Sequence, residues 1–242
     1  MLGKKSFFGI EIIHRKPQTL KLQYVLGAGL VKQEPSFSVI EFDRKQFFIN
    51  GKEPLRLFDE LAERCIKSIY PIHIKVSKEN KMISVPNIKK MQSKWKKELK
   101  LLKKEFKGDT VDTYFEQISQ NLSTEKKFLK SLDCDIGYSL LLSIHTIEST
   151  GPEKQNGIRF PFPITPYNPK NVFYGSFSSK LEHNGKRMKS FKGIDETNGN
   201  LEINYLFGEN LFFVNKIEGN FSSKTLGKEI GYRVTYLKNR QN

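Results

Sequence analysis

The first fifty residues alternate between apolar and polar side chains. Apolar residues occupy every second position in 8–12 and 20–24, and further apolar stretches follow at 37–42 and 47–49. A period of two places successive side chains on opposite faces of a sheet. The N-terminal pattern therefore predicts half-buried antiparallel strands over residues 1–52.

A helical period replaces this alternation after residue 53. Pro54 suits the first turn of a helix, and apolar side chains recur every three or four residues until Tyr70-Pro71. The stripe contains Leu57, Phe58, Leu61, Cys65, Ile66 and Ile69. Alternation returns at 72–76, and apolar residues resume at 82–85 after a polar run. Residues 53–86 are thus predicted to form a helix and a short hairpin.

The central third, residues 87–147, is predicted to be helical. Asn87 suits an N-cap for a helix over 87–107, whose apolar stripe contains Ile88, Met91, Trp95, Leu99, Leu102 and Phe106. Much of the remaining surface is lysine: Lys89, Lys90, Lys94, Lys96, Lys97, Lys100, Lys103, Lys104 and Lys107. Shorter helical patterns follow at 111–122 and 123–132. The apolar stretch 136–144 is expected to be a buried helix or strand.

Residues 148–171 contain several prolines and lack a clear period. The stretch that begins Arg159-Phe-Pro-Phe-Pro is expected to be stiff and extended, because each proline fixes its own φ angle. Such a connection either binds an aromatic groove of a partner or spans an edge of the domain, and the second is favoured. Beyond it, apolar stretches separated by turn-rich pieces predict an antiparallel meander over 172–242.

Glycine and asparagine mark the expected turns. Asn50-Gly51, Asn184-Gly185 and Asn198-Gly199 are typical of tight hairpins. Glu218-Gly219-Asn220 is read in the same way, and Gly27-Ala28-Gly29 is read as a turn or bulge.

These elements predict an α+β fold. We expect a curved antiparallel sheet built from N- and C-terminal strands, with the central helical segment packed on one face or end. A single domain over 1–242 is the favoured organisation. Two small domains divided near residue 150 are the alternative.

Charge is distributed unevenly along the chain. The formal net charge is +15, and residues 75–107 hold 12 basic and 3 acidic side chains, a net of +9. The next segment, 108–159, holds 5 basic and 8 acidic side chains, a net of −3. The basic peak contains lysine and no arginine, whereas arginine is the usual residue for bidentate recognition of phosphates and bases. A solvated helix face and a docking face for an acidic partner both fit this pattern.

Cysteine and histidine offer little chemistry. Cys65 belongs to a helical apolar stripe, and Cys134 lies between Asp133 and Asp135, whose charges oppose thiolate formation. The four histidines are spread along the chain, so the sequence contains no local metal pair. No Gly-rich phosphate loop is present either. We therefore predict no cofactor and no bound metal.

One enzyme hypothesis rests on Asp43 and Lys45, which share a side of a predicted strand. With a further carboxylate from Glu34 or Glu11, this pair could hold Mg²⁺ and position a water molecule, as in metal-dependent nucleases. An Asp-x-Lys pair also suits an exposed strand face, and it is common by chance.

The leading hypothesis is a non-catalytic binding or assembly protein, with no catalytic residue. It presents a lysine-rich amphipathic helix to an acidic protein or larger complex; non-specific nucleic acid and a peripheral anionic surface are the other partners considered. The predicted partner-binding residues are Lys89, Lys90, Lys94, Lys97, Lys100 and Lys104. A carrier of an apolar ligand and the nuclease are the alternatives. Without an apolar run of about 18 residues or a signal peptide, we expect a cytoplasmic protein with no transmembrane segment, or one that is injected or assembled without a classical signal peptide.

Overall fold

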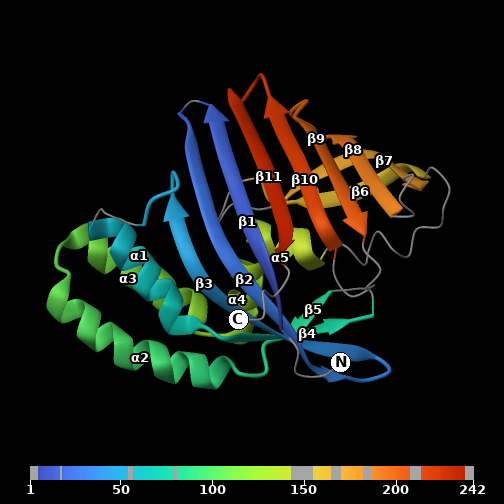
Figure 1. The fold of residues 1–242 in the computed structure, drawn as a ribbon. Helices are drawn as coiled ribbons and strands as arrows, with labels where there is room; N and C mark the ends of the chain where they lie inside the picture. The colour runs from blue at the N-terminus through green and yellow to red at the C-terminus, as the bar shows by residue number, and fades with distance from the viewer. Residues whose placement is uncertain are drawn as a thin grey trace.

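The computed structural model describes residues 5–16, 18–53, 57–78, 81–142, 155–164, 170–181, 187–207 and 214–237. Over these ranges the chain forms an eleven-stranded sheet and five helices. The strand order is β5-β4-β3-β2-β1-β11-β10-β9-β8-β7-β6, and every neighbouring pair is antiparallel. The prediction of an α+β fold with an antiparallel sheet is confirmed (Figure 1).

The N-terminal strands form one side of the sheet. They are β1 (Lys5–Lys16), β2 (Leu20–Gln33), β3 (Phe37–Ile49), β4 (Ile72–Ser77) and β5 (Met82–Ser84). Asn50 and Gly51 have φ angles of 52° and 78° and lead from β3 into a bridge between Ile49 and Lys52. This is the predicted turn, and it needs residues that tolerate a positive φ.

The C-terminal strands form the other side. They are β6 (Gln155–Phe162), β7 (Asn171–Leu181), β8 (Arg187–Ile194), β9 (Asn200–Phe207), β10 (Val214–Ser223) and β11 (Lys228–Leu237). The two sides join where β1 pairs with β11, with Ile10 opposite Val234. The first and last thirds of the chain therefore share one sheet.

On the C-terminal side of the sheet, two strands that are not neighbours in the strand order contact each other. The rings of Phe162 on β6 and Tyr232 on β11 lie 5.3 Å apart, although four strands separate β6 from β11 in the sheet. The Tyr232 hydroxyl also donates a hydrogen bond to the carbonyl oxygen of Ile164. These contacts hold the edge strand β6 against the core face of β11.

The helices follow one another in the central third: α1 (Leu57–Ile69), α2 (Ile88–Glu105), α3 (Asp109–Leu122), α4 (Glu125–Asp133) and α5 (Ile136–Leu142). Figure 1 shows α1, α2 and α3 gathered beside β3, and α5 behind the middle of the sheet. The Tyr138 ring of α5 meets Phe42 of β3 edge-on, at 4.9 Å between centroids. None of the helices in the described ranges combines the length and apolar character needed to cross a membrane.

The proline-rich connection predicted over 148–171 contains a strand that the sequence pattern did not reveal. Residues 155–162 form β6, and Pro161 lies opposite Val172 of β7. β6 is an edge strand. A proline has no N–H to donate, and an edge strand tolerates this because one side of its backbone has no neighbouring strand.

Two glycine-containing segments are not the turns that their sequences predict. Gly27-Ala28-Gly29 lies inside β2, and Glu218-Gly219-Asn220 lies inside β10. A bulge is the alternative for the first segment, but the bulges in the pairing of β2 with β3 lie before Leu26 and after Leu30. A Cβ on Gly27 would lie 3.1 Å from the Phe7 ring, so the glycine leaves room for a cross-strand aromatic side chain. Asn184-Gly185 lies outside the described residues, as do residues 143–147 of the predicted helical segment and 148–154 of the predicted connection.

The Asn198-Gly199 turn is confirmed, and a buried carboxylate organises it. Oδ1 of Asp195 accepts hydrogen bonds from the backbone nitrogens of Thr197 at 3.0 Å and Gly199 at 2.8 Å. Oδ1 also accepts from the Thr197 hydroxyl at 2.8 Å, and Oδ2 accepts from Asn171 at 2.7 Å. Asn198 follows this carboxylate with a φ of 58°. The Asp195 side chain therefore reinforces a turn that two backbone hydrogen bonds, from Asp195 to Gly199 and from Asn198 to Asp195, also close.

Candidate functional site: the lysine face of helix α2

Helix α2 buries one stripe of its surface. Met91, Trp95 and Leu102 are each at most 3% exposed, and Phe106 after the helix end is also buried. Their spacing of four or seven residues places them on one side of the helix. Asn87 occupies the N-cap position, but its side chain does not cap the helix. Its side-chain oxygen instead accepts a hydrogen bond from the backbone nitrogen of His73, and its side-chain nitrogen donates one to the Pro71 carbonyl oxygen.

Trp95 anchors the buried stripe to α3. Its indole Nε1 donates a hydrogen bond to Oγ of Ser119 at 2.9 Å, and its ring meets Phe115 edge-on at 6.3 Å. One turn earlier, Nε2 of Gln92 donates to the carbonyl oxygen of Leu122 at 2.7 Å. These contacts fix the rotation of α2 about its own axis.

Arg64 of α1 forms ion pairs with both acidic side chains of α2. Its guanidinium forms ion pairs with Glu98, at 3.5 Å, and with Glu105. It also lies 5.6 Å from the centre of the Phe106 ring. The Arg64 hydrogen bond holds the pKa of Glu105 below its ordinary value. Both carboxylates of α2 are therefore directed toward α1 rather than toward the lysines on the opposite side.

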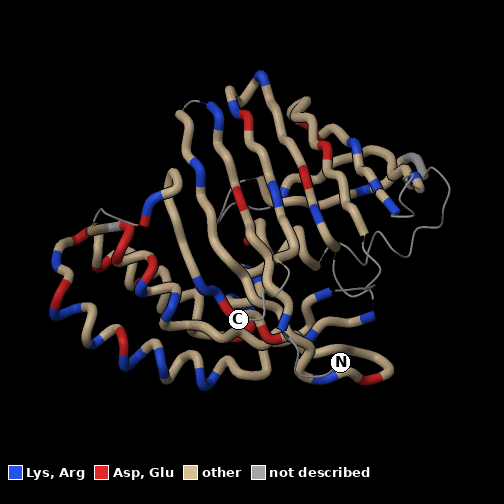
Figure 2. The backbone as a smooth tube through the Cα atoms, in the orientation of Figure 1, with Lys and Arg blue, Asp and Glu red and all other residues tan. Residues whose placement is uncertain are grey.

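Six lysines cover the side of α2 that faces away from the body. We call them the outer lysine face: Lys89, Lys90, Lys96, Lys97, Lys100 and Lys104. All six are exposed, and none forms an ion pair within the part of the chain that the structure describes. At a rise of about 1.5 Å per residue, the face extends for about 22 Å. Figure 2 shows the basic residues spaced along this helix.

The outer lysine face differs from the predicted set at two residues. Nζ of Lys94 donates hydrogen bonds to the carbonyl oxygens of Tyr70, at 2.6 Å, and Lys67, at 3.4 Å. Lys94 therefore caps the C-terminal end of α1 and is a positioning residue. Lys96 was not among the predicted site residues, although the helical period alone places it between Lys89 and Lys100 on the helix surface.

Acidic side chains bound the face at its C-terminal end. The first turn of α3 carries Asp109 and Asp112, both exposed, and Lys103 lies 3.9 Å from Asp112. The positive surface is thus a local patch that ends where α3 begins.

The proposed nuclease residues are engaged in ion pairs. Nζ of Lys45 lies 2.8 Å from Asp43, and Nζ of Lys5 lies 2.6 Å from the neighbouring Glu41. The hydrogen bond from Lys5 lowers the pKa of Glu41, which also binds His73. Asp43, the carboxylate of the nuclease hypothesis on this strand, therefore has a cationic side chain as its partner, and Glu41 beside it is paired as well.

The other two carboxylates considered for the nuclease are also paired. Glu11 pairs with Lys21 at 2.8 Å and Arg233 at 3.4 Å, and Glu34 pairs with Lys32 at 3.0 Å. The hydrogen bond from Lys21 lowers the pKa of Glu11. Across the described ranges, no group of three or more His, Cys, Asp or Glu side chains could hold a metal ion.

The two cysteines are free and poorly suited to act as nucleophiles. Cys65 is fully buried in α1, and burial raises the pKa of its thiol to about 12. For Cys134, burial and then the Asp133 charge raise the thiol pKa. A raised pKa leaves little thiolate at neutral pH.

Buried Tyr138 of α5 and the half-buried side chains of Tyr70 and Asp135 form a polar group. The Tyr138 hydroxyl donates to the Tyr70 hydroxyl at 2.9 Å, and Oδ1 of Asp135 accepts from the Tyr138 backbone nitrogen at 3.1 Å. Burial raises the pKa of Asp135. Because this carboxylate caps the short helix α5, its position has a structural explanation.

No protein-family model matches this chain, and a search of curated proteins finds no match to its sequence.

Proposed function

We propose that this protein is a non-catalytic binding or assembly protein, and that it docks an acidic protein surface through the outer lysine face of α2. The observation that carries the proposal is the set of six exposed lysines that lack ion-pair partners in the described part of the chain. Unpaired like charges on a fixed surface attract an oppositely charged partner and accelerate its association.

The contacts on the opposite side of α2 make this face a fixed surface. Trp95, Gln92 and Arg64 hold the helix to α3 and α1. A helix held in this way does not lose rotational freedom when a partner binds, and that lowers the entropic cost of association. The six amines therefore present a constant pattern to the partner.

The extent of the patch favours an acidic protein over a nucleic acid. A long nucleic acid that followed α2 beyond Lys104 would approach the carboxylates of Asp109 and Asp112. The patch also contains lysine without arginine, so it offers point charges rather than bidentate contacts to phosphates. A compact acidic surface about 22 Å long matches the lysines and avoids α3.

We further infer a single domain whose strongly curved sheet carries the helices on one face and at one end. The ring contact between Phe162 and Tyr232 supports the curvature, because it spans strands that are not neighbours. In this arrangement α2 lies at the margin of the molecule, where a partner can approach it (Figure 1). The described residues supply no observation that favours an apolar carrier or a nuclease.

Two charge-matched variants test the proposal. The outer variant changes Lys89, Lys97 and Lys104 to Gln, and the control changes Lys16, Lys180 and Lys224, three exposed lysines elsewhere, to Gln. Each lowers the net charge by three. Binding of labelled polyglutamate, measured by fluorescence anisotropy near 0.15 M salt, is expected to weaken roughly tenfold in the outer variant, since each exposed ion pair contributes about 0.2–1 kcal/mol. The control is expected to change little.

Two outcomes contradict the proposal. Equal loss in the two variants means that net charge, rather than the α2 surface, determines binding. A DNA duplex of about the same length as the polyglutamate serves as a second probe. If the outer variant loses affinity for DNA but not for polyglutamate, the partner is a nucleic acid and the proposed class of partner is wrong.

A further inference from the structure

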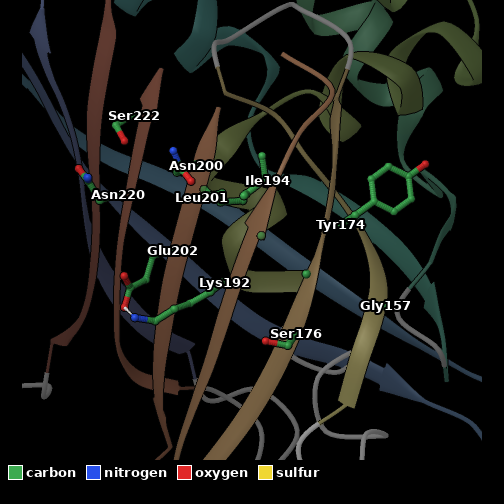
Figure 3. Close-up of a pocket in the computed structure, with 12 residues that line it drawn as sticks. Gly157, Tyr174, Ser176, Lys192, Ile194, Asn200, Leu201, Glu202, Asn220 and Ser222 are labelled. Carbon is green, nitrogen blue, oxygen red and sulfur yellow. Dashed lines mark ion pairs between the residues drawn. The ribbon is translucent and has the colours of Figure 1, made fainter. Parts of the chain in front are cut away.

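A shallow groove of about 700 Å³ crosses the sheet on the C-terminal side, far along the chain from the outer lysine face. Residues of five consecutive strands, β6 to β10, line it. In Figure 3, Tyr174 lies on one side, Asn220 and Ser222 lie on the other, and an ion pair lies between them. The groove has no role in the docking function proposed above.

Glycines on three neighbouring strands belong to the backbone that lines the groove, and the side chains that Gly175 and Gly193 lack would face the core rather than the groove. Gly157, Gly175 and Gly193 belong to β6, β7 and β8, and Gly175 lies directly opposite Gly193. A Cβ on Gly175 would lie 1.9 Å from the carbonyl oxygen of Lys192. The strands therefore approach each other more closely than any other residue at this position would allow.

One side of the groove is apolar and exposed. Tyr174 and Ile194 are cross-strand neighbours on β7 and β8, and they are 60% and 50% exposed. A tyrosine ring in this position offers a flat surface to which a ligand with an apolar face can bind.

Apart from Leu201 and the glycines, the remaining lining is polar, and it has no net charge. Lys192 and Glu202 pair at 3.0 Å, so their charges cancel. The side chains of Asn200 and Ser222 have no hydrogen-bond partner among the described residues. Arg15 donates to Oδ1 of Asn220 at 2.9 Å, which leaves the Asn220 amide nitrogen as a donor. The groove thus combines an aromatic surface with hydroxyl and amide groups.

We propose that this groove binds a neutral oligosaccharide. A sugar ring has an apolar face of C–H groups, which suits Tyr174, and a rim of hydroxyls, which suits Asn200, Asn220 and Ser222. The absence of net charge in the lining favours an uncharged ligand. Five strands about 4.8 Å apart give the groove a span of about 19 Å, which calls for several linked sugar units rather than one.

A peptide fits the same groove less well. Peptides gain affinity by adding a strand to a free sheet edge or by placing side chains in pockets. The floor of this groove consists of strands that already pair with their neighbours on both sides, apart from the edge strand β6. It is shallow, so it offers no deep pocket to an anchoring side chain.

The test is an NMR titration of the intact chain with neutral linear tetrasaccharides: α-1,4-linked glucose, β-1,4-linked glucose and β-1,4-linked N-acetylglucosamine. A neutral peptide of similar length is the comparison ligand. We expect at least one saccharide to shift the backbone amide signals of the groove residues. Tyr174→Ala should weaken that binding by roughly tenfold, the loss expected for an aromatic contact. Leu181→Ala is the matched control, because Leu181 lies on the same strand, is 70% exposed and does not line the groove.

The proposal is overturned if no saccharide shifts the groove signals at millimolar concentration, if the peptide alone binds, or if Tyr174→Ala binds as tightly as Leu181→Ala. The outer variant of α2 separates this inference from the docking proposal. Because the ligand is uncharged, that variant should bind the saccharide normally even though it loses polyglutamate.

Discussion

The indole nitrogen of Trp95 donates a hydrogen bond to the Ser119 hydroxyl, which in turn donates to the carbonyl oxygen of Phe115. This chain of two hydrogen bonds, 2.9 Å and 2.8 Å long, connects α2 to the interior of α3. The orientation of the outer lysine face depends on this connection, because Trp95 lies on the side of α2 opposite the lysines.

Trp95→Phe is expected to destabilise the fold by about 2 kcal/mol, since it removes the hydrogen bond and leaves a gap where the larger ring was. Ser119→Ala removes only the hydrogen-bonding groups and should cost about 1 kcal/mol. Urea unfolding measures the stability of both variants. Circular dichroism follows the unfolding, because Trp95 is the single tryptophan and Trp95→Phe has no tryptophan fluorescence to follow. Equal stability of Trp95→Phe and the wild type would contradict the proposed anchoring.

Lys94 and Lys97 should respond differently to loss of charge. Lys94→Met removes the donor to the Tyr70 and Lys67 carbonyls, so it should lower stability by about 1 kcal/mol. Lys97→Met should leave stability within about 0.5 kcal/mol. Urea unfolding measures the stability difference. In polyglutamate binding, Lys97→Met should show the greater loss. A greater loss of binding in Lys94→Met would place Lys94 in the docking face, and a greater loss of stability in Lys97→Met would contradict the capping role of Lys94.

The carboxyl of Asp195 should make stability depend on pH in the acidic range. Desolvation would raise its pKa, but the hydrogen bonds from Asn171 and Thr197 outweigh it, and the pKa lies below the ordinary value of 3.8. The folded state therefore favours the carboxylate. Its contribution is fully present above the ordinary pKa and is lost as pH falls through the lowered pKa of the folded state.

Asp195→Asn tests this dependence. The amide oxygen can replace Oδ1 as an acceptor, but the variant has no charge to titrate. Unfolding free energies measured between pH 2 and pH 6 should therefore fall less steeply toward low pH in the variant than in the wild type. Parallel curves for the two proteins would show that Asp195 titrates alike in the folded and unfolded states.

Gly175→Ala should be among the most damaging small substitutions in the sheet. The added Cβ would lie 1.9 Å from the Lys192 carbonyl oxygen, so β7 and β8 would have to separate. We expect a loss of about 3 kcal/mol. Gly9→Ala in β1 is the control, because its nearest neighbour, a terminal Leu237 methyl, lies 3.7 Å away. If thermal unfolding shows the same small loss of stability for Gly175→Ala and Gly9→Ala, the close approach of β7 and β8 does not exclude a larger side chain at position 175.

The sequence predicts those elements whose apolar pattern follows from local geometry. The stripe of Met91, Trp95 and Leu102 locates α2 because burial on one side of a helix imposes a period near 3.6. The alternation of Ile72, Ile74 and Val76 locates β4 for the corresponding reason in a strand. These patterns need no knowledge of the rest of the fold.

Features that depend on distant parts of the chain are not predicted. Pro161 and its neighbours form a strand because β7 lies beside them and the other edge has no partner. Gly219 reads as a turn in isolation, but it lies opposite Ile203 and Tyr232 of the flanking strands. Likewise, the exposure of the outer lysines follows from the helical period, whereas the engagement of Lys94 depends on how α1 docks beside α2.

Amine footprinting tests the central claim most directly. Exposed lysines of the wild-type protein are acetylated with a limiting reagent, with and without polyglutamate, and the modified sites are quantified by mass spectrometry. The docking proposal predicts that polyglutamate protects Lys89, Lys97, Lys100 and Lys104, while Lys16, Lys180 and Lys224 react at their original rates. Protection spread evenly over all of these lysines, or confined to those outside α2, would contradict it.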